Sequence, residues 1–393
     1  MVAINPASML DNDLYKFSMS YAYMKLFPEA EGTFVFCDRG KTEYTAKFVT
    51  ALQQELHRLA ERMLSNAERQ WCVQNIPYIP EWYWEWLESF YFNPNLIKLS
   101  LEKDGELKIE VTDKLYKVTL YEVPILYTVA ETYYKIYGKS LTVDQYQEIC
   151  RKTEEKCKIA EEAGFKFSEF GTRRRYSYEV QDTVVAVCKN STSCVGTSNV
   201  HLAMKYDMKP IGTVAHEWVM FHGAMYGYNE ANYMAYKNWV KVYDGNLGIA
   251  LTDTYTSKVF FKNFSLQHAK LFDGIRQDSG DEKDFVERAL VRYDELGINP
   301  LTKTIVFSNA LDFPKAAQIA EYCKGKIKAS FGIGTNLTND IEGVQPRNIV
   351  MKLMHCRMNP RQEWVNCVKI SDDIGKVMGA DEEVKTAIYK LGL

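Results

Sequence analysis

Histidine is scarce in this sequence, and its cysteines lack the spacing that a metal site requires. The 393 residues include six histidines and nine cysteines, and no two cysteines form a C-x-x-C pair. Structural zinc sites are typically built from such pairs together with clustered histidines. The pattern therefore argues against bound zinc and predicts reduced, buried thiols, which are usual in a cytoplasmic protein.

Long apolar runs and a strong charge excess are also missing. No stretch approaches the ~18 apolar residues that cross a bilayer. The first residues, MVAINPASMLDNDLYK, lack the basic and apolar regions of a secretory signal. The formal net charge of −3 argues against a general nucleic-acid binder. We therefore expect a cytoplasmic protein with no membrane and no nucleic-acid partner, in which only a local group of arginines and lysines holds an anion.

The chain divides into three predicted segments. Residues 1–123 form a mixed N-terminal α/β domain, and residues 124–345 alternate amphipathic helices, such as 141–164, with short strands. Residues 346–393 return to strand-like alternation, and we expect this C-terminal segment to rejoin the N-terminal domain. Within the first segment, alternating apolar residues predict strands at 33–40, 107–113 and 116–123.

Seven short strands of the middle segment each end in polar residues and precede a helical pattern. Alternating strands and helices form a parallel sheet through right-handed crossovers. Seven polar strand ends in succession predict a closed, irregular TIM-like α/β barrel, with the active site where these ends meet. The stretches are KFSEFGTRRR (166–175), CVGTSN (194–199), KPIGTVAH (209–216), LGIALTDTYTS (247–257), FDGIRQDSGD (272–281), TIVFSNALD (304–312) and KASFGIGTN (328–336).

The first of these strand ends offers three consecutive arginines, Arg173, Arg174 and Arg175. A solvated basic turn explains them equally well by themselves. At the mouth of a barrel, however, guanidinium groups suit phosphate or carboxylate, to which they make paired charged hydrogen bonds. The sequence does not say which of the three faces a ligand.

The last strand end, FGIGTN, offers a glycine-rich turn. Gly332 and Gly334, followed by Thr335, would let backbone N–H groups approach a phosphate closely. A tight turn that needs glycine for its backbone angles is the plainer interpretation.

The strand ends IRQDSGD and LTDTY supply the acids. The first places Arg276, Asp278, Ser279 and Asp281 close together, and the second adds Asp253. Helix capping accounts for one acid, but an arginine with two acids at a barrel mouth also fits Mg²⁺ held through water and substrate phosphates.

The stretch IGTVAHEWV (211–219) sets His216 beside Glu217. A lone histidine in an apolar run is more often a core residue than a catalyst, but polar strand ends surround this one. Adjacent residues can point to different sides, so the sequence leaves open whether Glu217 orients the imidazole. Several barrel chemistries fit at this point, including phosphosugar isomerases and aldolases, although no strand-end lysine other than nearby Lys258 could form a Schiff base.

Seven motifs in register resemble the nicotinate phosphoribosyltransferase family over about residues 9–360. The resemblance implies a type II phosphoribosyltransferase fold, an irregular α/β barrel beside a smaller α/β domain. It also implies NAD salvage by joining nicotinate to phosphoribosyl pyrophosphate, with ATP hydrolysed in the process. The motifs are DNDLYKFSM (11–19), EFGTRRR, GTSN, GTVAHEW, GIRQDSGD, FSNALD and FGIGTN.

The resemblance assigns roles to individual residues. His216 corresponds to the family's histidine that ATP transiently phosphorylates, and an imidazole nitrogen is a competent nucleophile. Thr213 corresponds to a position against nicotinate, and Arg276 to the arginine that pairs with the pyridine carboxylate. Tyr15 corresponds to the tyrosine that stacks on the pyridine, which in relatives comes from a neighbouring subunit. This implies a homodimer with shared active sites.

The remaining roles concern the second substrate. Thr335 corresponds to a position that contacts the ribose phosphate, with Gly332 and Gly334 opening the backbone. We expect one or more of Arg173–Arg175 to help hold phosphoribosyl pyrophosphate. Mg²⁺ would bridge the pyrophosphate, with Asp278 as the best candidate ligand.

Ser198 bears on the choice of substrate. Nicotinamide-using relatives carry aspartate in the corresponding GTD motif, whereas this chain reads GTSN. A buried aspartate facing the nicotinate carboxylate would be repelled, while serine can donate a hydrogen bond. The alternative, a nicotinamide phosphoribosyltransferase, is therefore less favoured. A quinolinate enzyme would need more Arg and Lys, and a non-catalytic nucleotide sensor would be expected to have lost His216 or Arg276.

Overall fold

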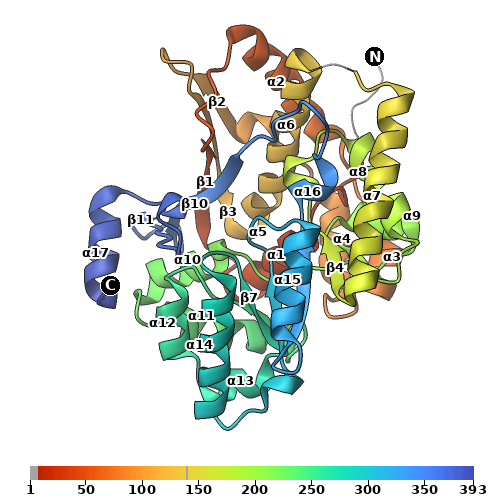
Figure 1. The fold of residues 1–393 in the computed structure, drawn as a ribbon. Helices are drawn as coiled ribbons and strands as arrows, with labels where there is room; N and C mark the ends of the chain where they lie inside the picture. The colour runs from red at the N-terminus through yellow and green to blue at the C-terminus, as the bar shows by residue number, and fades with distance from the viewer. Residues whose placement is uncertain (1–7, 139) are drawn as a thin grey trace.

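The computed structural model describes residues 8–138 and 140–393. Within them, eleven strands form two sheets, one antiparallel and one parallel (Figure 1). The strands are β1 (Glu31–Asp38), β2 (Ile97–Leu101), β3 (Leu107–Lys114), β4 (Lys166–Glu169), β5 (Cys194–Thr197), β6 (Ile249–Leu251), β7 (Gly274–Gln277), β8 (Thr304–Phe307), β9 (Lys328–Ile333), β10 (Ile349–Arg357) and β11 (Val365–Asn366).

The antiparallel sheet joins the two ends of the chain. Its order is β11-β10-β1-β3-β2, and β10 pairs with β1 along its whole length. In β3, Leu107, Ile109 and Val111 are buried while the residues between them face outward, which is the alternation of a half-buried strand. The predicted strands at 33–40 and 107–113 are confirmed, and β10 of the C-terminal segment lies beside β1 in the same sheet.

The parallel sheet carries the strand ends that the sequence singles out. Its order is β5-β4-β9-β8-β7-β6, with every neighbouring pair parallel. The segment after α9 (Val200–Tyr206) lies between the two outer strands. On one side Pro210 forms a bridge with Thr197 of β5, and on the other the Thr213 hydroxyl donates to the Ile249 carbonyl of β6 at 3.3 Å. This is the arrangement that an irregular α/β barrel would have.

Helices cover both sheets. The predicted helix at 141–164 is confirmed as α7: Thr142 and Gln145 form a capping box at its start, and Gly164 ends it in the left-handed conformation. The helices are α1 (Leu14–Leu26), α2 (Ala46–His57), α3 (Asn66–Asn75), α4 (Glu81–Ser89), α5 (Leu115–Val118), α6 (Glu122–Tyr137), α7 (Val143–Ala163), α8 (Tyr178–Cys188), α9 (Val200–Tyr206), α10 (His216–Tyr226), α11 (Ala231–Tyr243), α12 (Ser257–Asn263), α13 (Leu266–Leu271), α14 (Glu282–Glu295), α15 (Phe313–Cys323), α16 (Thr335–Thr338) and α17 (Asp381–Leu391).

Two predicted strands are wrong. Residues 116–123 lie in α5, a 3-10 turn and the start of α6, and Val118, Leu120 and Tyr121 are buried on several sides. A run buried all round does not reveal its period, so strand and helix cannot be told apart from it.

Residues 209–216 make a single bridge, at Pro210, before α10 begins at His216. Pro210 has no N–H to continue a ladder. Gly212 lies against α1, where a side chain would come within 2.9 Å of the Tyr15 nitrogen.

The domain limits at 123 and 345 stay predictions. Residues 123 and 124 both lie inside α6, which is buried over most of its length. No helix in the described part of the chain is both long and apolar enough to cross a membrane.

Candidate active site

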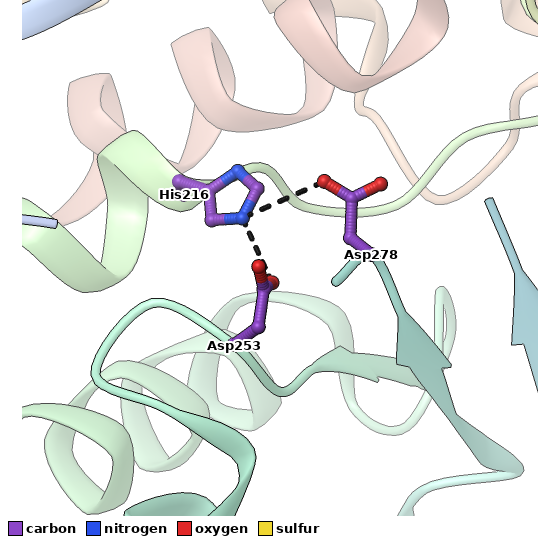
Figure 2. A group of neighbouring side chains, drawn as sticks. All are labelled: His216, Asp253 and Asp278. Atoms are coloured by element: carbon purple, nitrogen blue, oxygen red, sulfur yellow. Dashed lines mark hydrogen bonds and ion pairs between the residues drawn. The ribbon is translucent and has the colours of Figure 1, made fainter. Parts of the chain in front are cut away.

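His216 stands at the first turn of α10 and faces two acids from neighbouring strand ends (Figure 2). Its Nε2 lies 2.9 Å from Oδ1 of Asp253, which follows β6, and 3.7 Å from Oδ2 of Asp278, which follows β7. Both imidazole and Asp253 are buried. Because the carboxyl ends of parallel strands meet at one edge, residues 216, 253 and 278 come together from three separate motifs.

The contact with Asp253 determines which ring nitrogen is free. A carboxylate only accepts hydrogen bonds, so Nε2–H donates to Asp253 and Nδ1 keeps its lone pair. No residue that the structure describes hydrogen-bonds to Nδ1. Burial and the nearby Lys369 ammonium lower the pKa of His216 to about 4, although Asp253 acts in the opposite direction. The imidazole is thus neutral near pH 7, as a nucleophile must be.

Glu217 does not orient the histidine. Its carboxylate accepts from the Lys16 ammonium and from the Thr119 hydroxyl, both buried. Lys16 also pairs with Glu122. The carboxylate that holds the His216 ring is therefore Asp253, which the sequence offers only as one acid among several.

Arg276 and Asp278 are held as a pair. The Arg276 guanidinium donates to Asp278 Oδ1 at 3.1 Å and to the Ser308 hydroxyl at 2.8 Å, and that hydroxyl donates to the same Oδ1 at 2.7 Å. Burial opposes ionisation of Asp278, yet Arg276 and His216 hold its pKa below the usual range. The Arg276 side chain stays 20% exposed.

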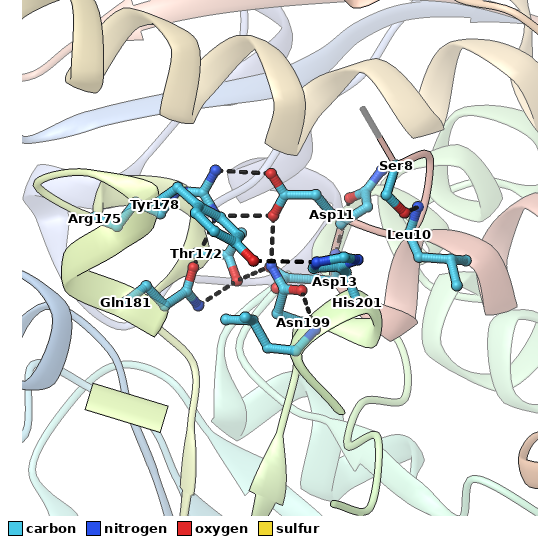
Figure 3. A network of polar contacts seen from close by, with 12 residues as sticks. Ser8, Leu10, Asp11, Asp13, Thr172, Arg175, Tyr178, Gln181, Asn199 and His201 are labelled. Atoms are coloured by element: carbon cyan, nitrogen blue, oxygen red, sulfur yellow. Dashed lines mark hydrogen bonds and ion pairs between the residues drawn. The ribbon is translucent and has the colours of Figure 1, made fainter. Parts of the chain in front are cut away.

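The three consecutive arginines separate into two roles. Arg175 is fully buried and holds both oxygens of Asp11 at 2.8 Å (Figure 3). It also donates to Glu131 at 2.6 Å. It is therefore a structural residue. Arg173 lies 3.9 Å from Glu122, and Arg174 donates to the Ile349 carbonyl.

Positive charge accumulates near Arg174. Burial, with Arg173 and Arg39 nearby, lowers its pKa to about 10. Arg39 follows β1, and the sequence pattern of the first segment contains nothing that distinguishes it. Such an excess of guanidinium charge is suited to an anion.

Helix α1, which carries Tyr15, lies against the segments of Ser198 and Thr213 within one chain. The Leu14 N–H donates to the Ser198 carbonyl at 2.8 Å, and the Ser18 hydroxyl reaches both the Tyr15 and the Thr213 carbonyls, at 3.0 and 2.7 Å. The expectation that a neighbouring subunit supplies the tyrosine to the site stays a prediction. The hydroxyl of Ser198 donates to Asp13 at 2.7 Å.

The glycine turn has a packing explanation. A Cβ on Gly332 would lie 2.5 Å from the Phe170 ring, and one on Gly334 would lie 2.8 Å from the Phe170 carbonyl. Both glycines therefore allow β9 to pack against the end of β4. Thr335 follows as the first residue of the short helix α16.

The C-terminal segment contributes residues that the sequence interpretation missed. After β11, Lys369 and Ser371 reach Oδ2 of Asp253, each at 3.3 Å. Lys376 donates to the Asp278 carbonyl and to Asn309, both at 2.7 Å. The stretch EWVNCVKISDD has the pattern of a sheet strand, so nothing in it indicated a place at the barrel mouth.

A divalent cation fits this site mainly through phosphates and water. His216, Asp253 and Asp278 bring one ligand atom each within 4.8 Å of one another. However, Lys369 and Arg276 already neutralise the two carboxylates. Asp278 Oδ2 is the oxygen best placed to hold Mg²⁺, because its partner Oδ1 is occupied by Arg276 and Ser308.

The fold and the site together define an α/β enzyme with a buried, neutral histidine between two carboxylates and an arginine-rich edge suited to anions. The chain matches the model of the nicotinate phosphoribosyltransferase (NAPRTase) family over residues 165–391 and that of the NAPRTase N-terminal domain over 10–130. It belongs to the nicotinate phosphoribosyltransferase family.

Similar proteins agree over the whole chain. A nicotinate phosphoribosyltransferase of Chromohalobacter salexigens is 40% identical over 388 residues, covering 98% of each chain. The enzyme of that name from Methanosarcina mazei is 39% identical over 403 residues, again with 98% of each chain. The crystal structure of the Porphyromonas gingivalis protein superposes with a TM-score of 0.96 at 46% identity, covering 98% of this chain and 99% of that one.

Proposed function

We propose that this chain joins nicotinate to phosphoribosyl pyrophosphate, forms nicotinate mononucleotide and pyrophosphate in NAD biosynthesis, and couples this transfer to ATP through His216. The observation that carries the proposal is the neutral imidazole whose Nε2–H is held by Asp253 while Nδ1 stays free. Membership of the family supports the transfer reaction, and the histidine geometry supports the coupling.

In the coupling step, the Nδ1 lone pair attacks the γ-phosphorus of ATP. An N–P bond forms, the bond from that phosphorus to the bridging oxygen breaks, and ADP leaves. The ring gains positive charge, which Asp253 stabilises at 2.9 Å. Water later cleaves the N–P bond and releases phosphate. Bound Mg²⁺ supplies positive charge that neutralises the phosphates, and Asp278 is its proposed ligand.

Nicotinate is proposed to bind between Tyr15 and Thr213, with its carboxylate on Arg276. The guanidinium can turn one edge to a planar anion while Asp278 holds the other. Ser198 is proposed to contact the ring substituent, and its hydroxyl would have to turn from Asp13 to do so. The nitrogen of the ring then attacks the anomeric carbon of the ribose as pyrophosphate leaves.

Phosphoribosyl pyrophosphate is proposed to bind where Arg173 and Arg174 face the glycine turn. Gly332, Gly334 and Thr335 would contact the ribose phosphate. Little proton transfer is needed, so positioning and electrostatic stabilisation supply most of the rate.

A homodimer and a cytoplasmic location, both expected from the sequence, stay predictions. As the resemblance implies, we propose a dimer with shared active sites, in which Tyr15 of one chain completes the nicotinate site of the other. The nine cysteines, all free thiols in this structure, are compatible with a reducing compartment.

The test is mononucleotide formation by the purified protein with phosphoribosyl pyrophosphate, with and without Mg-ATP, offered nicotinate or nicotinamide. We expect product from nicotinate and stimulation by ATP. His216→Ala should lose the stimulation while slow ATP-independent transfer persists, and His355→Ala, at an exposed position, should behave like the wild type. Product from nicotinamide alone would overturn the substrate assignment. Intact stimulation in His216→Ala would overturn the role of the histidine.

A further inference from the structure

A C-terminal loop, residues 369–378, closes over the strand ends that hold the catalytic histidine. Its base is an antiparallel bridge in which Lys369 and Met378 exchange both backbone hydrogen bonds at 2.9 Å. The preceding strands β10 and β11 belong to the antiparallel sheet, so one segment serves both sheets.

This loop touches three different strand ends of the barrel. At the loop after β6, the Ile370 N–H donates to the Thr254 carbonyl at 2.8 Å. At the loop after β7, the Gly280 N–H donates to Asp373 at 3.1 Å. At the loop after β8, Lys376 donates to Asn309. The loop is therefore held by a polar contact at each of the three strand ends.

Within it, Lys369 makes the contact closest to the chemistry. Its ammonium is buried and lies 3.3 Å from Oδ2 of Asp253, whose Oδ1 receives Nε2–H of His216. The same Oδ2 accepts from the Ser279 hydroxyl at 2.7 Å and the Ser371 hydroxyl at 3.3 Å. Three donors on one oxygen stop the carboxylate from rotating, which directs its other oxygen at the imidazole.

Resting on the proposed coupling of ATP through His216, we propose that Lys369 is a positioning residue for phosphorylation of that histidine. It acts through Asp253 and fixes the carboxylate that orients the ring and stabilises the positive charge that develops on it. A buried carboxylate needs a compensating cation, and Lys369 supplies it from a segment distant in sequence. The C-terminal segment thus takes part in ATP coupling as well as in the antiparallel sheet.

The positioning role of Lys369 is distinct from the transfer of phosphoribose to nicotinate. Lys369 has no contact with Tyr15, Thr213 or Arg276 among the interactions of the described residues. Loss of its charge should therefore slow phosphoryl transfer to His216 and leave ATP-independent transfer of phosphoribose unchanged.

The experiment is single-turnover labelling of the full-length protein with ATP labelled in its γ-phosphate. The acid-labile phosphate retained on the protein is measured beside the ATP-independent rate and the thermal midpoint. We expect Lys369→Met to slow labelling roughly 10- to 100-fold, the usual cost of losing a group that orients a functional side chain. Lys369→Arg should restore most of the rate, because a cation returns to the same place.

The matched control is Lys303→Met. Lys303 is also buried, but it precedes β8 at the opposite end of the barrel and donates to the Phe272 carbonyl at 2.6 Å. It should lower the thermal midpoint without slowing the labelling of the folded protein. Ser371→Ala, which removes only one hydroxyl from Asp253, provides a milder probe if Lys369→Met does not fold.

The outcomes are distinct. Labelling of Lys369→Met at the wild-type rate, or an equal loss of labelling in Lys303→Met, would overturn the role of Lys369 and leave the phosphohistidine standing. No labelling of the wild type would overturn the phosphohistidine itself, and with it the role of Lys369. If Lys369→Met does not fold, labelling of Ser371→Ala at the wild-type rate overturns it too.

Discussion

Two buried ionic clusters lie at the same end of this barrel and differ in how completely their groups are satisfied. Around Arg175, the guanidinium holds Asp11 through two bonds and Gln181 accepts from it (Figure 3). Glu131 also accepts from it, and the Tyr127 ring lies 4.2 Å away. Around His216, Asp253 occupies one ring nitrogen and no described residue occupies the other (Figure 2).

The difference separates stability from chemistry. A buried charge with every donor used resists change, because removal of any partner leaves an unpaired group behind. A buried ring with one free lone pair can form a new bond without breaking an existing contact. Arg175 belongs to the fully paired cluster, whereas its neighbours Arg173 and Arg174 in the same motif do not.

The largest expected effect is on the reactive cluster. Asp253→Asn should lower ATP-stimulated activity roughly 10²- to 10⁴-fold, because an amide no longer selects the tautomer with a free Nδ1. Steady-state kinetics with and without ATP would measure this. Asp273→Asn, at an exposed position before β7, is the control. An unchanged ATP stimulation in Asp253→Asn would mean that the His216 cluster is not the reactive one.

In the Arg175 cluster, whose groups are paired, we expect a substitution to change the stability of the fold. Arg175→Met should lower the free energy of unfolding by about 3–5 kcal/mol, since it leaves Asp11 and Glu131 without their main partner in a buried site. Urea denaturation measures the change. Arg151→Met, which removes only exposed ion pairs on α7, should cost less than about 1 kcal/mol. Equal losses in the two variants would contradict the comparison.

A smaller effect concerns a second histidine on α10. His222 is saturated: Nδ1–H donates to the Trp218 carbonyl at 2.7 Å and Nε2 accepts from Asn238 at 2.9 Å. Burial lowers its pKa to about 4. Between that value and the ordinary value of about 6.5, the unfolded chain binds a proton that the folded chain does not. This contribution to stability is therefore present above about pH 6.5 and lost as the pH falls toward 4.

The variant His222→Gln keeps a donor and an acceptor but does not titrate. Its free energy of unfolding should depend less steeply on pH, by up to about 3 kcal/mol over that range. Denaturation at several pH values would show it, and His57→Gln, at an exposed position, should leave the dependence unchanged. A slope identical to that of the wild type would mean that His222 binds a proton in the folded state.

Much of the barrel could be predicted because each strand and its neighbouring helix carry a local pattern. Six of the seven predicted strand ends follow regular strands β4 to β9. The exception is 209–216, whose backbone packs against α1 where Gly212 lies close to the Tyr15 nitrogen. These two residues are 197 positions apart, so no local pattern contains the contact. The short run 116–123 failed for a related reason, since contacts on all sides remove the period that distinguishes strand from helix.

By itself, the sequence determined most of the succession of strands and helices, the family, and the set of polar residues at the strand ends. Tertiary structure decided how those residues divide the work. It pairs His216 with Asp253 rather than with its neighbour Glu217, buries Arg175 beside two partly exposed arginines, and brings Lys369 from the segment after β11 to the barrel. Hydrogen bonds and charge compensation depend on distances between segments remote in the chain, and these exist only once both sheets have packed.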